Sequence, residues 1–135
     1  MGVIVDTSIW VGVERGRITP DRVAEVTGED AVYLTPPVIA ELEYGVQRAQ
    51  TEAQQNRRLA AIAKIKRKPS LMIDSETGAV FGRLAEYLDR QGRPSRHRVQ
   101  DLWICALAIQ NGYRVLTQNV KDFTDVPGVD VLSLD

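Results

Sequence analysis

The stretch that decides the fold is Val3–Trp10, VIVDTSIW, near the start of the chain. Its first three residues are apolar and β-branched, as is typical of a buried strand. Asp6, Thr7 and Ser8 then offer helix N-caps, and the apolar residues that follow begin a helix. A short strand that passes through a polar cap into a helix is the repeating unit of α/β folds. We therefore expect Asp6 to lie at the carboxyl end of the first strand.

Short strands and helices continue to alternate along the rest of the chain. Apolar segments predict further strands at residues 31–34, 71–73, 114–117 and 129–132. Capping residues and helical spacing predict further helices at residues 19–28, 35–46, 47–68, 74–92 and 99–110. This alternation favours an α/β fold with a mostly parallel central sheet, a three-layer α/β/α sandwich. The length of 135 residues fits one domain, residues 1–135.

The composition, 44% hydrophobic and 26% charged, is that of a soluble globular protein. No apolar segment is long enough to cross a bilayer, so we expect no membrane partner and a cytoplasmic location. The single cysteine, Cys105, cannot form an internal disulfide and is interpreted as core filling.

Positive charge is concentrated in two runs. The net charge of −1 argues against a protein that holds nucleic acid only through a broad basic face. Residues 57–68 nevertheless carry six basic side chains and no acid, and residues 93–98 carry three arginines. Each run is explained by a solvated surface or by contact with a phosphate backbone, and the sequence leaves both explanations open.

Four acidic residues fall where the loops of a parallel sheet converge. They are Asp6, Glu41, Asp101 and Asp122, with Asn119 close to the last. In open α/β sheets, ligands bind beyond the carboxyl ends of the strands. Several carboxylates in one crevice repel one another unless a cation joins them, and hard divalent cations prefer oxygen ligands. The pattern therefore predicts a cation site.

Each acid also has a purely structural explanation. Asp6 and Asp101 suit helix N-termini, and Asp122 suits a turn. Glu41 and Glu43 both suit an exposed helix, and their separation of roughly 200° around the helix axis lets only one face the crevice. We favour Glu41, because it lies nearer the positive end of the helix dipole.

Several other chemistries lack their motifs. The chain has no Gly-rich phosphate loop after its first strand and no Gly-x-Ser-x-Gly elbow. Its only histidine, His97, has no partner for zinc, and Ser8 stands where a haloacid-dehalogenase-like phosphatase needs a second Asp. A receiver-like signalling module that binds Mg²⁺ stays open as an alternative, with Asp74 as its phosphate acceptor.

Four segments resemble, in order and spacing, the PIN-domain ribonucleases, and in particular the VapC-type toxins of toxin-antitoxin modules. The segments are Val3–Ser8, Ile39–Gly45, Asp101–Ala106 and Leu116–Phe123. Each is short, but together they cover the chain in the order that the family shows.

The resemblance implies a PIN fold and an endoribonuclease that depends on Mg²⁺ or Mn²⁺. It implies a catalytic and metal-binding set of Asp6, Glu41, Asp101 and Asp122, completed by Asn119 in the catalytic role. It also implies an RNA substrate, a small antitoxin protein as partner, and a homodimer. The residues expected to contact the substrate are Thr7, Ser8, Lys64, Lys66, Arg96 and Arg98. A second alternative keeps this chemistry in a housekeeping RNA-processing or DNA-acting nuclease of the same superfamily.

Overall fold

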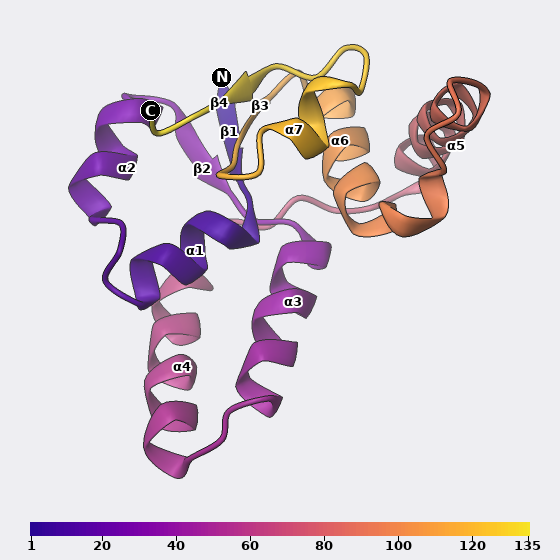
Figure 1. Ribbon diagram of the computed structural model, residues 1–135. Coiled ribbons are helices and arrows are strands. Elements are labelled where there is room, and N and C mark those ends of the chain that lie inside the picture. The colour runs from indigo at the N-terminus through magenta and orange to yellow at the C-terminus, as the bar shows by residue number, and fades with distance from the viewer.

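The computed structural model describes residues 1–135, and a four-stranded parallel sheet forms its centre (Figure 1). The strands are β1 (Gly2–Val5), β2 (Ala31–Tyr33), β3 (Arg114–Leu116) and β4 (Val131–Leu132). Their order across the sheet is β2-β1-β3-β4, and every neighbouring pair is parallel. β2 lies on one side of β1, whereas β3 and β4 lie on the other. The strand order therefore reverses between β1 and β3, which is where ligands bind in open α/β sheets.

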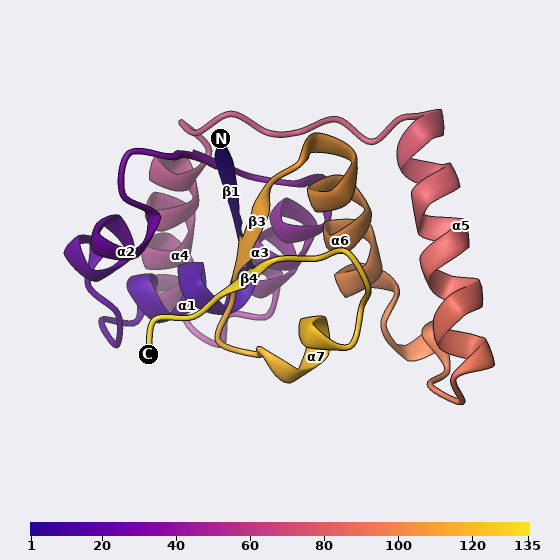
Figure 2. The same cartoon turned by 90° about the horizontal axis from the view of Figure 1, so that it is seen from above.

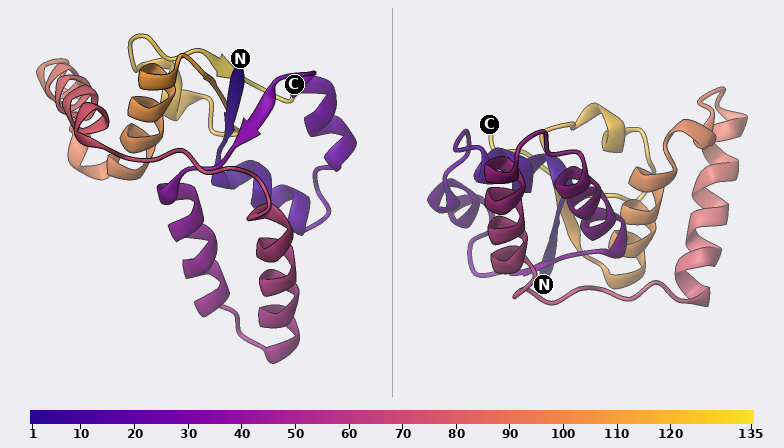
Figure 3. Two further views of the ribbon diagram at one scale, coloured as in Figure 1. Left: turned by 180° about the vertical axis from the view of Figure 1, so that it is seen from behind. Right: turned by 90° about the horizontal axis from the view of Figure 1, so that it is seen from below.

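The helices cover both faces of the sheet. They are α1 (Thr7–Glu14), α2 (Pro20–Thr27), α3 (Pro36–Gln47), α4 (Glu52–Ile65), α5 (Ser75–Arg90), α6 (Val99–Asn111) and α7 (Lys121–Thr124), with a 3₁₀ turn at Ser95–His97. Seen from above, α1 and α2 lie on one side of the sheet and α6 on the other, with α5 outside α6 (Figure 2). α3 and α4 pair as a hairpin that projects from the body (Figure 3). The predicted three-layer α/β/α sandwich is confirmed, and none of the helices has the length and apolar composition to span a bilayer.

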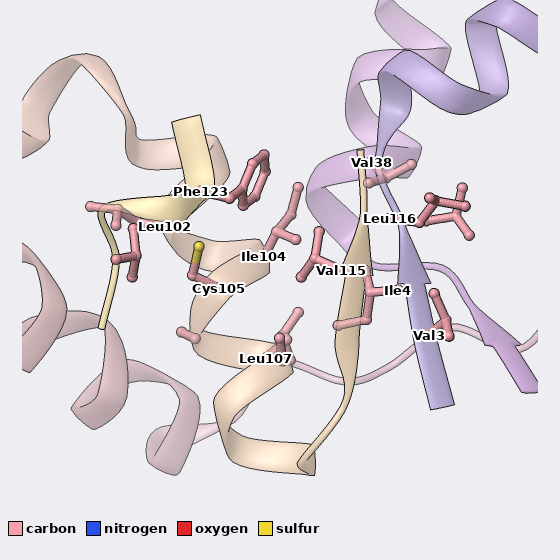
Figure 4. Packing of buried hydrophobic residues seen from close by; sticks show 14 of the residues in the cluster. Val3, Ile4, Val38, Leu102, Ile104, Cys105, Leu107, Val115, Leu116 and Phe123 are labelled. Carbon is pink, nitrogen blue, oxygen red and sulfur yellow. The ribbon is translucent and has the colours of Figure 1, made fainter. Parts of the chain in front are cut away.

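The core lies between β1, β3 and α6. Ile4, Val115 and Leu107, one from each of these elements, have no exposed surface (Figure 4). Phe123 of α7 is equally buried and joins the same cluster. Cys105 is also core filling, as predicted, and burial raises the pKa of its thiol to about 12.

Local capping fixes where several of the helices begin and end. Thr35 precedes α3, and its Oγ1 accepts a hydrogen bond from the Val38 amide at 3.4 Å. Asp74 and Thr77 form a reciprocal capping box at the start of α5. Gly112 ends α6 in the left-handed conformation that the Asn-Gly pair predicts, with φ of 71°.

One predicted strand was wrong, and one predicted helix is shorter than expected. Residues 71–73 form no strand. The chain leaves the sheet after Leu34 and begins α3 at Pro36, so only one bridge, between Leu34 and Ser70, forms beside β2. Met72 is consequently 81% exposed. The helix expected over residues 47–68 is present as α4 and begins only at Glu52. Thr51 caps its start, since its Oγ1 accepts a hydrogen bond from the Gln54 amide at 3.0 Å.

Replacing Phe123 with Ala is expected to lower the free energy of unfolding by about 3 kcal/mol, because the ring is buried and leaves a cavity. Urea unfolding monitored by circular dichroism measures this. Tyr87→Ala is the control, because Tyr87 is 43% exposed and its loss has a much smaller effect. Equal losses in the two variants would contradict the burial of Phe123 in the core.

Candidate functional site

Asp6 lies directly after β1, at the point where the strand order reverses. Its amide donates to the Leu116 carbonyl at 2.9 Å and so extends the β1–β3 ladder by one residue. Asp6 occupies the N-cap position of α1, but its side chain makes no capping hydrogen bond. Instead, Oδ2 accepts from Thr117 Oγ1 at 2.9 Å and from Ser8 Oγ at 3.2 Å. Capping therefore does not explain the carboxylate, which is only 5% exposed.

Glu41 and Asp101 reach the same crevice from α3 and α6. Burial raises the pKa of Glu41, the charge of Asp6 raises it further, and the nearby Thr7 hydroxyl lowers it. Burial raises the pKa of Asp101 to about 6, with further contributions from the charges of Asp6, Asp122 and Glu41. Asp101 thus lies within electrostatic range of the other three carboxylates, and Glu41 lies within range of Asp6.

Arg98 lies close enough for its charge to lower the pKa of Asp101, but its guanidinium is bound to Asp125 rather than to any of these four carboxylates. None of the four carboxylates takes part in an ion pair. Thr7 Oγ1 faces Glu41 outside hydrogen-bond geometry, and it is the one buried side-chain polar atom without a partner. No three His, Cys, Asp or Glu side chains stand close enough to form a ready-made set of metal ligands. A hydrated ion such as Mg²⁺ needs only one or two carboxylates and keeps its waters, so these residues fit one.

Asp122 and Asn119 enter the site differently. Asp122 is an exposed residue of α7, and its charge acts on Asp101. The backbone of Asn119 shapes the turn after β3: its amide donates to Thr117 Oγ1 at 2.9 Å, and its carbonyl accepts from the Asp122 amide at 2.9 Å. Asn119 therefore holds the loop through main-chain hydrogen bonds.

Thr117 is the residue that the sequence reasoning missed. It is fully buried, donates to Asp6 and accepts from Asn119, so it links the loops after β1 and β3. No pattern in the sequence marks it. The register of the sheet, in which Val5 pairs with Leu116, makes the next residues, Asp6 and Thr117, neighbours.

The residues predicted to contact substrate are not all free to do so. Ser8 is engaged within the crevice, where its Oγ also accepts from the Gln118 amide at 3.2 Å. Lys66 pairs with Glu43 at 3.4 Å on the exposed side of α3. Arg98 is held in a two-pronged ion pair with Asp125.

Two of the predicted contacts remain exposed and form no ion pair, namely Lys64 on α4 and Arg96 in the 3₁₀ turn before α6. Arg96 lies five residues before Asp101 in the sequence, so it is close along the chain to the acidic crevice.

The sequence profile of the PIN domain family matches residues 3–129, almost the whole chain. The chain belongs to the PIN-domain family. Two curated relatives of this PIN domain are named ribonuclease VapC. The protein from Rickettsia bellii is 33% identical over 135 residues, which cover 99% of this chain and 97% of the relative. Ribonuclease VapC5 from Mycobacterium tuberculosis is 33% identical, covering 93% of this chain and 87% of the relative.

Solved structures resemble this PIN domain over its full length. The toxin-antitoxin complex VapBC-5 from Mycobacterium tuberculosis contains a chain with 28% identity and a TM-score of 0.73, with 98% of both chains covered. VapBC2 from Rickettsia felis, solved with a DNA fragment from its promoter, has a TM-score of 0.84 at 21% identity over all of both chains. The second likeness concerns the fold alone.

Replacing Asp101 with Asn is expected to stabilise the metal-free protein at pH 7.5 and to have little effect at pH 4. A carboxyl whose pKa is raised on folding favours the native state only while it is protonated. This contribution is complete below the unfolded pKa of about 3.9 and is lost as the pH rises through about 6.

The gain expected at pH 7.5 is about 1 kcal/mol after discounting for solvent screening at this half-exposed group. Chemical denaturation in EDTA at pH 4 and 7.5 measures it. Asp21→Asn is the matched control, since Asp21 is an exposed acid in the first turn of α2. A gain independent of pH, or one shared by the control, would contradict the prediction.

Proposed function

We propose that this PIN domain is a divalent-metal-dependent endoribonuclease that hydrolyses RNA phosphodiester bonds and acts as the toxin of a type II toxin-antitoxin system. The observation that carries the proposal is the group of four carboxylates at the carboxyl edge of the sheet, in which Asp101 is repelled by the other three and none forms an ion pair. The relatives named ribonuclease VapC support the same activity.

In this proposal Asp6, Glu41, Asp101 and Asp122 hold Mg²⁺ or Mn²⁺, and Asp6 is the least exposed of the four. When bound, such an ion supplies positive charge beside the scissile phosphate and makes a water easier to deprotonate. The protein contributes the geometry. Ser8 and Thr117 donate to the same oxygen of Asp6, Oδ2, which fixes that carboxylate while no side chain donates to Oδ1. No side chain needs to act as a nucleophile.

Lys64 and Arg96 are the basic side chains we assign to RNA phosphates, because both are exposed and neither forms an ion pair. Thr7 and Ser8 line the crevice beside Asp6, where a reacting phosphate lies in this proposal. Single-stranded or loop RNA is the favoured substrate, since sequence-specific recognition of RNA mostly requires exposed bases.

An antitoxin protein is the proposed partner. VapBC-5, a member of the VapBC family of toxin-antitoxin systems, is among the solved structures that this chain resembles, and its matching chain is similar enough in sequence to support the inference. We also propose a homodimer. The toxin role is favoured over a housekeeping nuclease because the curated relatives named here carry the VapC name.

The receiver-like alternative is not favoured by the position of Asp74. Its Oδ1 accepts from the Thr77 amide at 3.1 Å and from Gln110 Nε2 at 2.9 Å. These hydrogen bonds hold the pKa of Asp74 below its usual value. Gln110 lies nine residues after Asp101 on α6, roughly 14 Å along the helix axis, so Asp74 lies far from the acidic crevice.

Purified protein free of antitoxin is expected to cleave a mixed RNA pool with Mg²⁺ or Mn²⁺ and not with EDTA. Asp6→Asn and Asp101→Asn should each lower the rate roughly 100-fold, because each removes charge from the proposed ion site. Glu43→Gln is the matched control, since Glu43 lies two residues from Glu41 but faces solvent. Cleavage that persists in EDTA, or in both Asn variants, would reject the proposed chemistry.

Mn²⁺ is expected to raise the melting temperature of the wild-type protein in the absence of RNA. An ion at 100 times its dissociation constant contributes about 2.7 kcal/mol of stability. Asp6→Asn should lose most of this shift, and Glu43→Gln should keep it. Differential scanning fluorimetry with and without Mn²⁺ provides the comparison, and an equal shift in all three proteins would place the binding elsewhere.

A further inference from the structure

Arg98 and Asp125 form the least exposed ion pair in the molecule. Arg98 Nη1 lies 2.7 Å from Asp125 Oδ2, and Nη2 lies 2.6 Å from Oδ1. The two side chains are only 18% and 21% exposed, whereas every other pair contains a more exposed member. A two-pronged contact between guanidinium and carboxylate fixes orientation as well as distance.

The same guanidinium also holds the backbone beside a site residue. Arg98 Nη2 donates to the Asp122 carbonyl at 2.5 Å. Arg98 directly precedes α6, three residues before Asp101, and Asp125 directly follows α7, which carries Asp122. One side chain therefore joins the start of α6 to α7.

α7 depends on contacts of this kind to stay in place. It has only four residues and no side-chain hydrogen bond at its N-cap, so it has little stability of its own. Phe123 and Val126 bury their side chains beneath it. Its acid, Asp122, is repelled by Asp101, and this repulsion pushes α7 away from α6. The attraction between Arg98 and Asp125 acts against that push.

We propose that Arg98 is a positioning residue: through Asp125 and the Asp122 carbonyl, it holds Asp122 at a fixed place opposite Asp101. This inference rests on the proposed metal-dependent nuclease. It replaces the expectation that Arg98 contacts an RNA phosphate, because both ends of its guanidinium are already occupied within the protein. Loss of Arg98 then weakens ion binding and turnover while leaving RNA affinity unchanged.

The test compares Arg98→Met, Asp125→Asn and the double variant by isothermal titration of Mn²⁺ without RNA. Each single variant is expected to bind Mn²⁺ about tenfold more weakly, and the double variant no more weakly than either single one. Arg98→Lys should recover only part of the affinity, because an ammonium group cannot make the two-pronged contact. Cleavage assays should show a lower kcat with KM for RNA within twofold of wild type.

Asp125→Asn separates positioning from phosphate contact, because it releases Arg98 without removing it. It also releases Arg93, a more exposed partner of Asp125 at 3.3 Å, so Arg93→Met is measured beside it and should keep wild-type Mn²⁺ affinity. If Arg98 bound substrate, this variant would keep its Mn²⁺ affinity and its KM, whereas Arg98→Met would raise KM. That result would overturn the inference. Where Arg98→Met fails to fold, Arg98→Lys and Asp125→Asn carry the same comparison.

Arg114→Met is the matched control. Arg114 pairs with Asp30 at 2.6 Å, with side chains 33% and 26% exposed, at the amino ends of β3 and β2 and thus at the opposite edge of the sheet. It should lower stability without changing Mn²⁺ affinity, and equal loss of affinity in both arginine variants would overturn the inference. A wild-type protein that binds Mn²⁺ and cleaves RNA, beside Arg98 variants that match it, would reject the inference alone. A wild-type protein that does neither would reject the proposed function and this inference with it.

Discussion

The parallel pairing of β1 with β3 is the constraint on which the rest of the molecule depends. Both strands are buried in the core, and their register leaves one place for Asp6, beside Thr117. Because side chains alternate between the two faces of a strand, a shift of one residue would turn the apolar residues of β1 away from their present neighbours. The burial that stabilises the fold therefore also sets the first residue of the site.

The carboxylates of the acidic crevice repel one another and therefore lower the stability of the fold. Asp101 and Glu41 are half-buried among like charges, and both have raised pKa values. A protein selected for stability alone has no reason to gather such groups, so the arrangement is typical of a functional site. The sheet, the helix termini and the contacts around α7 together hold the carboxylates near one another despite their repulsion.

The sequence predicts the parts of the fold that local chemistry controls. The β-branched run before Asp6 and the threonine before the Pro36–Pro37 pair each mark an element that the structure contains. The strand predicted at Leu71–Ile73 is absent, because an apolar triplet becomes a strand only where a neighbouring strand can pair with it, and β2 is too short to do so. The roles of Thr117 and Arg98 were harder still to predict from the sequence. Their roles depend on partners 111 and 27 residues away, and no local pattern encodes these contacts.

Cys105 gives the protein a built-in reporter of its own opening. It is the only cysteine, it is fully buried, and its thiol stays protonated at physiological pH. Thiol-reactive reagents and mild oxidants therefore cannot reach Cys105 or react with it while α6 stays packed against β3. Cys105 also lies one helical turn after Asp101. The rate at which a thiol reagent labels the native protein consequently measures how often the helix that carries Asp101 separates from the core.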